Sequence, residues 1–163
     1  RNGGSAVLAP MLVSFLFTLV AMPASIMGNE LAIRFGRHRA ISSVMLLSAA
    51  VAIAIGLGLE LPPTALLALL LVYAWTVPGD SGALTSGMAA SATSTHRGAT
   101  MAMHSTVGFG LSAVGSWAFG VALDLGGGPA AEAGWRLGFL LLALSIAMGP
   151  VALWWSRGGA QSR

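Results

Sequence analysis

Residues 40–59 read AISSVMLLSAAVAIAIGLGL, a stretch without a single charged side chain. About 20 apolar residues in a helix cross the hydrocarbon core of a membrane, which is about 30 Å thick. Four more stretches of mostly apolar residues recur, so we expect five transmembrane helices at about 6–29, 40–59, 63–91, 98–123 and 136–156. Strands of a membrane β-barrel are only about 9–11 residues long and alternate in polarity. The pattern therefore predicts an all-α integral membrane protein with a single transmembrane domain over residues 1–163.

The overall composition supports a lipid environment. Charged residues make up 8% of the chain and hydrophobic residues 56%, whereas ordinary soluble domains contain about 25% charged residues. The net charge of +3 comes from arginines that form no continuous basic run, so a nucleic-acid partner is not expected. Cysteine is absent, which excludes disulfides and thiolate metal sites. We expect the lipid bilayer as a partner, and neither a cofactor nor a metal ion.

The charges between the apolar stretches predict the orientation. If the chain weaves through the membrane five times, six arginines fall on one side: Arg34, Arg37, Arg39, Arg97, Arg157 and Arg163. The other side carries Arg1 and Arg136 together with the acids Glu60, Asp124 and Glu132. Loops rich in Arg and Lys stay in the cytoplasm, so the six-arginine side and the C-terminus are expected there. Many Ala, Gly and Arg residues without any Lys are typical of a GC-rich bacterial genome, and hence favour the inner membrane.

The segment between the first two stretches, residues 31–39 (LAIRFGRHR), carries a recognisable motif. It resembles the loop signature of the major facilitator superfamily, G-x-L-A-D-R-x-G-R-R. Two positions differ: Ile33 replaces the aspartate, and the leading glycine falls one residue early. The positions that carry the resemblance or stand beside it are Gly28, Glu30, Arg34, Gly36, Arg37 and Arg39.

This resemblance implies a fold and a function. The five stretches would correspond to helices eight to twelve of a twelve-helix carrier, and so to an incomplete C-terminal six-helix bundle. The chain, which opens on Arg1, would begin inside a longer protein whose N-terminal half is its partner. Such carriers are not enzymes. They move a small solute by alternating access, driven by a proton or solute gradient, and symport, antiport and uniport all remain open.

The arginine motif has two interpretations on physical grounds. Three arginines within six residues anchor a helix end to lipid phosphates, or they pair with acids and helix ends of a neighbouring bundle to form a gate. Because Ile33 replaces the aspartate of the family motif, a charge relay through that position is in doubt. Glu30 is expected to pair instead with Arg34, four residues further along a helix.

Asp80 is the main candidate for a functional residue. It lies about twelve residues from the arginine-rich end of its stretch, or about 18 Å at the helical rise, and so near the bilayer midplane. A carboxylate at that depth must face water or a partner, which makes a substrate or proton-coupling role the first hypothesis and a structural buried acid the second. His104 lies at a similar depth on the next helix and is a candidate partner. Residues that could line the same cavity are Tyr73, Trp75, Ser81 and Thr85.

Two further patterns concern helix packing. Pro78-Gly79 falls in the middle of the third stretch and should loosen that helix. In the fourth stretch small residues recur every four positions, at Gly108, Ser112, Ser116 and Gly120. Such a face allows another helix backbone to approach closely. A helix that is merely rich in glycine is the alternative.

The competing functions are an intramembrane protease and a membrane scaffold without transport activity. Gly79-Asp80-Ser81-Gly82 fits the G-x-S-G pattern of rhomboid serine proteases, with His104 as a base for Ser81. The rhomboid histidine comes much further downstream, however, and rhomboids have no counterpart to the arginine motif. A secondary transporter is therefore the preferred interpretation.

Overall fold

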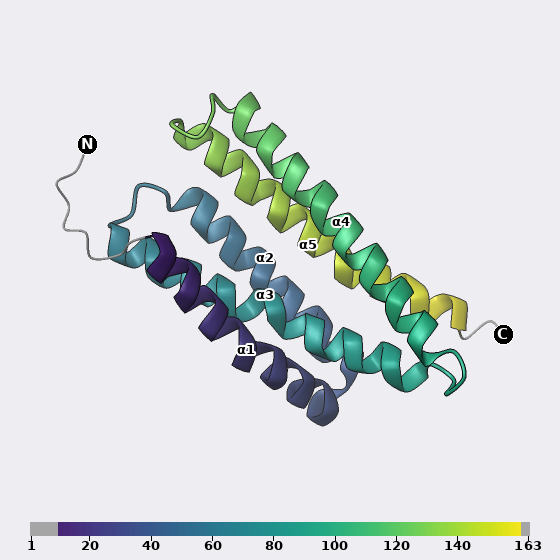
Figure 1. Cartoon of the computed structure of the whole chain (residues 1–163). Helices are drawn as coiled ribbons and strands as arrows, with labels where there is room; N and C mark the ends of the chain where they lie inside the picture. The colour runs from purple at the N-terminus through teal and green to yellow at the C-terminus, as the bar shows by residue number, and fades with distance from the viewer. Residues whose placement is uncertain (1–9, 161–163) are drawn as a thin grey trace.

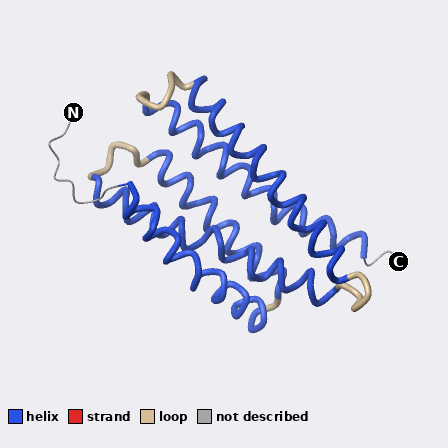
Figure 2. The backbone as a smooth tube through the Cα atoms, in the orientation of Figure 1, coloured by secondary structure: helices blue, strands red, loops and turns tan. Residues whose placement is uncertain are grey.

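The computed structural model describes residues 10–160, which form five long α-helices. They are α1 (Pro10–Phe35), α2 (Arg37–Leu57), α3 (Pro63–Ser91), α4 (Arg97–Leu125) and α5 (Glu132–Ala160). Each helix is long and apolar enough to cross a membrane. Within the described part of the chain there is no strand, as Figure 2 shows. The all-α class and the five spanning helices are thus confirmed, and they indicate a multi-pass membrane protein.

The helices run back and forth beside one another, so that the connections alternate between two ends of the bundle (Figure 1). The α1–α2 and α3–α4 connections lie at one end, which we call the arginine-rich end because it carries Arg34, Arg37, Arg39 and Arg97. The α2–α3 and α4–α5 connections lie at the other, the acidic end, with Glu60, Asp124, Glu132 and Arg136. Arg157 belongs to the last turn of α5, while Arg1 and Arg163 lie outside the described residues. The predicted separation of charges is present.

The first helix differs from its predicted bounds. Residues 6–9 lie outside the described part, and α1 continues to Phe35, six residues beyond the expected end. Gly28, Glu30 and Arg34 are therefore helical, and the expected loop shrinks to Gly36, whose φ of 89° is one that glycine adopts readily. Charged residues end the hydrophobic stretch, but they do not break a helix that has left the hydrocarbon. Similar extensions enlarge α4 and α5 relative to the predicted spans.

The closest packing in the bundle joins α1 to α3. Gly28 faces Gly79 so tightly that a Cβ on Gly28 would collide with the Gly79 carbonyl group. One turn away, a Cβ on Gly82 would collide with the backbone of Ser25. Buried alanines flank these contacts at Ala24, Ala32 and Ala83. In lipid, helices associate through such close backbone contact rather than through exclusion of water, so α1 and α3 form one packed unit.

A second packed unit joins α2 to α5. Ala49 and Ala52 of α2 meet Ala143 of α5 in a cluster of buried small residues. At the acidic end, Arg136 Nε donates a hydrogen bond of 3.3 Å to the carbonyl oxygen of Gly56, in the last turn of α2. A cation at a helix C-terminus interacts favourably with the helix dipole. This bond therefore holds the beginning of α5 against the end of α2.

The small-residue face of α4 has no helix packed against its glycines within the described residues. No helix of the described residues approaches Gly108 or Gly120, since a Cβ on either glycine would meet open space. Ser112 and Ser116 donate instead to carbonyl oxygens of their own helix, at 2.9 Å each. Small residues permit close approach but do not enforce it. The small positions of α1 and α3 match one another, whereas α4 packs chiefly beside α5.

The α1–α3 contact makes a direct prediction for stability. Gly28→Ala should push α1 and α3 apart and destabilise the protein by about 1–3 kcal/mol, the usual range for overpacking. Gly110→Ala is the matched control, because a Cβ there meets nothing within 4 Å. Thermal unfolding of both variants in detergent measures the difference. Equal melting temperatures would show that the two helices do not touch at Gly28.

The alternation of the connections can be tested by chemical labelling, because the chain has no native cysteine. Ser94→Cys in the α3–α4 connection and Ala130→Cys in the α4–α5 connection place single thiols at exposed positions. With the full-length protein in cells, a membrane-impermeant maleimide should reach the cysteine at position 130 from outside. The cysteine at position 94 should react only after the membrane is opened. Reaction of both from the same side would contradict the five-helix weave.

Candidate functional site

One face of α3 lines a series of three cavities. The residues that it contributes are spaced three or four apart, which keeps them on one side of a helix: Leu66, Leu70, Tyr73, Ala74, Val77, Pro78, Ser81, Leu84 and Thr85. The opposite face of α3 is the one sealed against α1 and α2 by Gly79, Gly82 and Ala83. The cavities therefore open on the side of α3 that faces α4 and α5.

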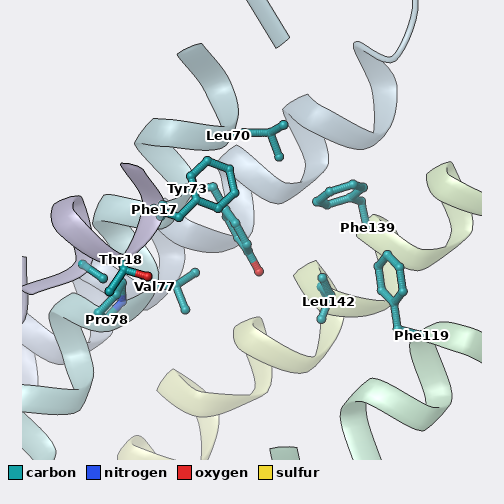
Figure 3. Close-up of a pocket in the computed structure, with 11 residues that line it drawn as sticks. Phe17, Thr18, Leu70, Tyr73, Val77, Pro78, Phe119, Phe139 and Leu142 are labelled. Carbon is teal, nitrogen blue, oxygen red and sulfur yellow. The ribbon is translucent and has the colours of Figure 1, made fainter. Parts of the chain in front are cut away.

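The largest of the three, with a volume of about 480 Å³, lies in the middle of this face and is shown in Figure 3. We call it the aromatic cavity. Phe17, Tyr73 and Val77 line it from α1 and α3, while Phe119 and Phe139 enter from α4 and α5 (Figure 3). Thr18, Ala21, Leu70, Ala74, Pro78 and Leu142 complete the lining. Four of its eleven lining residues are aromatic, so the aromatic rings dominate its wall.

The rings hold one another in position. Phe139 stands edge-on to Tyr73, with centroids 6.3 Å apart, and edge-on to Phe119 at 5.9 Å. Phe119 meets Trp135 in the same way at 6.1 Å. Gly138 makes room for Phe119, since a Cβ there would lie 2.6 Å from the ring. Edge-to-face pairs each contribute about 0.5–1.5 kcal/mol beyond their burial, so this wall of the cavity is preorganised.

Two polar atoms in the wall of the aromatic cavity are free to bond to a ligand. The hydroxyl of Tyr73 points into the space between α3 and α5 (Figure 3) and forms no hydrogen bond with any described residue. The second atom is the carbonyl oxygen of Ala74, because Pro78 has no N–H to donate to it. By contrast, the Thr18 hydroxyl is occupied, since it donates to Ser14 of its own helix at 3.0 Å. Both atoms are oxygens that can accept a hydrogen bond, and the Tyr73 hydroxyl can also donate one.

The second cavity, of about 350 Å³, continues the first towards the acidic end. Leu70 and Phe139 line both cavities, so the two are adjacent. Leu59 and Glu132 lie at its far edge, where α2 ends and α5 begins. The remaining lining residues are Ile55, Leu66 and Trp135. A carboxylate thus stands at the entrance to an otherwise apolar passage.

The third cavity, of about 370 Å³, lies between α3 and α4 on the arginine-rich side and is the most polar. We call it the polar cavity. It brings together three of the predicted site residues, Ser81, Thr85 and His104, with Gly108 and Ser112 of the small-residue face of α4. Leu84, Ser105 and Phe109 complete it. The small residues of α4 therefore border a cavity instead of a helix.

Asp80 is not a lining residue of the polar cavity but is bonded to one. Its Oδ1 accepts a hydrogen bond of 3.2 Å from the hydroxyl of Ser81, which lines the cavity. Asp80 is also spaced four residues before Leu84 and seven after Tyr73, so it shares a helix face with residues of two cavities. Among the described residues, no hydrogen bond or ion pair joins Asp80 to His104. The predicted Asp80–His104 pair is not formed here.

The remaining predicted residues are divided between different cavities. Trp75 lines a separate, smaller space of about 110 Å³ between α1, α2 and α3, together with Gly28 and Gly79. Tyr73 belongs to the aromatic cavity, about two turns of α3 before Ser81 and about three turns before Thr85. Helical spacing from the sequence does not show which side of α3 faces these three cavities, which together we call the groove, because both sides of the helix carry small and aromatic residues.

The arginine motif is held to α1 and α3 by several contacts. Arg34 Nε donates to Glu30 Oε1 at 2.7 Å, which confirms the predicted pair. The two side chains are 67% and 53% exposed, so the pair contributes only about 0.3–0.5 kcal/mol. The Arg37 side chain lies across Gly87 of α3. Such contacts are consistent with anchoring and with gating alike.

Beside this ion pair, at the residue before Glu30, α1 and α3 are joined by a direct hydrogen bond. Ser86 Oγ donates to Asn29 Oδ1 at 2.6 Å. Hydrogen bonds between membrane helices contribute about 0.6 kcal/mol on average. The bond therefore adds modestly to the α1–α3 contact.

Comparison of the chain with protein-family models, with curated proteins and with solved structures found no match. The site must therefore be interpreted from its own geometry. Sequence reasoning did not identify Phe17, Phe119 and Phe139, because a phenylalanine in a membrane helix usually faces lipid or a neighbouring helix. Their convergence depends on how α1, α4 and α5 meet α3. The only signal in the sequence was Tyr73, the single tyrosine of the chain.

The two faces of α3 should differ in chemical accessibility. Thr85→Cys places a thiol in the polar cavity, whereas Thr76→Cys places one on the buried face. Thiol reagents attack the thiolate, which needs water, so a small charged methanethiosulfonate should modify the cysteine at position 85 roughly ten-fold faster or more. Rates measured on the purified full-length protein provide the comparison. Equal rates would show that this cavity is not open to water.

Proposed function

We propose that the chain is part of a secondary carrier that moves a small solute across a membrane by alternating access. The observation that supports this proposal is the row of cavities along α3, which passes from the acidic end through an aromatic middle to a polar section beside Asp80. Carriers hold their solute near the bilayer midplane, between helices that rearrange around it. Asp80 and Pro78 lie at that depth in α3.

The distribution of close contacts agrees with a moving part. α3 is sealed to α1 by glycine contacts and to α2 by Gly79 against Val44, whereas the polar cavity separates α3 from α4. Pro78 interrupts the hydrogen bonding of α3 beside the aromatic cavity. A change in the angle of α3 at this point would open or close the groove towards α4 and α5. A helix that is closely packed on one face and borders cavities on the other can bend at Pro78 without losing its contacts with α1 and α2.

From the resemblance of residues 31–39 to the family's loop signature, we propose that this carrier belongs to the major facilitator superfamily, with α1 to α5 as its last five helices and a further bundle completing the solute site. The positive-inside rule puts the arginine-rich end in the cytoplasm, and the composition favours a bacterial inner membrane. Coupling to protons through Asp80 is the mechanism that we propose, because a carboxyl group at midplane depth can carry a proton between two aqueous sides.

A serine protease is less well supported by the geometry. Ser81 and His104 line the same cavity, but Ser81 donates its hydrogen bond to Asp80. Among the described residues no hydrogen bond joins Ser81 to His104, as a nucleophile and its base require. Covalent labelling by a fluorophosphonate, lost in Ser81→Ala, would identify a protease after all.

Asp80→Asn tests the coupling. The substitution keeps the shape of the side chain and its ability to accept from Ser81, but the amide cannot ionise. Full-length protein in vesicles is first screened with radiolabelled sugars, amino acids, organic anions and organic cations to find a solute that exchanges. For that solute, we expect the variant to retain exchange and to lose accumulation driven by a proton gradient.

Ser145→Ala provides the control and should accumulate solute normally, because Ser145 donates to the Leu141 carbonyl of its own helix and lines none of the three cavities. Wild-type accumulation in Asp80→Asn would remove Asp80 from the mechanism and leave His104 as the next candidate. Absence of movement of every solute class, in both directions, would contradict the carrier function and favour a membrane scaffold.

A further inference from the structure

We infer that the aromatic cavity recognises a lipophilic organic cation, with its apolar body among the rings and its positive centre near the Tyr73 hydroxyl and the Ala74 carbonyl. The inference names a substrate class and rests on the proposed carrier function. It depends on three properties of the cavity: its size and apolar lining, the arrangement of its aromatic and oxygen groups, and the placement of charge around it.

The size and lining select an apolar ligand. A volume of about 480 Å³ lies within the usual range for small-molecule sites, about 300–1,000 Å³. Among its eleven lining residues only Thr18 and Tyr73 carry polar side-chain groups, and the Thr18 hydroxyl is already used within α1. A sugar or an amino acid would lose most of its hydrogen bonds to water here without replacement, which costs about 1–3 kcal/mol for each group. An apolar body loses nothing.

The aromatic and oxygen groups select a positive charge. Aromatic ring faces carry negative electrostatic potential and attract cations within about 6 Å of the ring centre. Tyr73, Phe119 and Phe139 all line the cavity and meet at interplanar angles of 79° and 89°, so neither pair is stacked face to face. The Ala74 carbonyl, which lacks its helical donor because of Pro78, adds a negative dipole end. No part of this wall supplies a donor cluster for an anion.

The charges around the groove agree with this choice. None of the three cavities is lined by an arginine, and His104 in the polar cavity is the one basic side chain among their lining residues. Carboxylates lie on both sides of the aromatic cavity: Glu132 lines the neighbouring cavity, and Asp80 stands beside the polar cavity. Arg136 directly follows Trp135, which lines the second cavity, but its Nε donates to the Gly56 carbonyl oxygen. Along this path an anion would meet only His104 and the Tyr73 hydroxyl as donors, whereas a cation would meet a carboxylate at each end.

A pair of ions with almost the same size and shape separates charge from hydrophobicity. Tetraphenylphosphonium is positive and tetraphenylborate is negative. Binding of each radiolabelled ion to purified full-length protein is measured by equilibrium dialysis, with protein-free detergent micelles subtracted. We expect tetraphenylphosphonium to bind at least about ten-fold more tightly, since one charge–carboxylate or cation–π contact alone is worth that order of affinity.

Ring variants locate the binding. Tyr73→Leu and Phe139→Leu each keep an apolar side chain but remove a ring, so each should weaken tetraphenylphosphonium binding by about 5-fold to 30-fold. Tyr73→Phe restores the ring and should bind within about three-fold of the wild type, which separates ring loss from misfolding. Phe15→Leu is the matched control, because Phe15 is 61% exposed and lines none of the three cavities.

Equal affinity for the two ions, or equal binding by Tyr73→Leu and Tyr73→Phe, would overturn the inference. If the two ions bind equally but vesicles accumulate a sugar or an amino acid, the carrier function is supported and the cation site is contradicted. Ring-dependent binding of tetraphenylphosphonium without movement of any solute gives the reverse result: the cation site stands and the carrier function falls. The two proposals can therefore fail separately.

Discussion

The structure depends on one constraint, namely that hydrocarbon offers no hydrogen bonds to the backbone. Every amide and carbonyl group within the membrane must then be satisfied inside the segment, which makes helices the form that these stretches adopt. The same solvent removes the hydrophobic drive to pack helices together, so their association depends on close contact. The glycine pair Gly28 and Gly79 supplies that contact, and a single added Cβ is enough to prevent it.

The consequence of this contact is that α3 has two different sides. Its tight side uses Gly79, Gly82 and Ala83 against α1 and α2. Its other side is left to line cavities, because α4 packs chiefly beside α5 and the space opposite Ser81 and Thr85 is not filled. A helix that is held on one side and free on the other can position a solute site without being rigid throughout. Pro78 lies between the two halves of this open side.

The arginines and the acids nearest the cavities occupy different positions in the structure. The arginines lie at the helix ends, where they meet Glu30, the Gly87 backbone or the Gly56 carbonyl. The acids nearest the cavities, Asp80 and Glu132, are held within or beside the groove. In the proposed carrier, orientation in the membrane and selection of a ligand would thus depend on different residues. The aromatic rings that line the central cavity come from four helices and carry no formal charge.

The sequence by itself determined the class of the fold, the number of spanning helices and the ends at which charge collects, because each follows from local hydropathy and from the cost of burying charge. It also determined that Glu30 and Arg34 pair, since that contact lies within one helix. Which helix faces meet was decided only by the tertiary structure. The ladder of small residues on α4 and the glycines of α1 and α3 are alike locally, but only α1 and α3 have partners that match each other in space. The aromatic cavity has the same origin, because Phe17, Tyr73, Phe119 and Phe139 lie far apart in the chain and converge only when four helices pack.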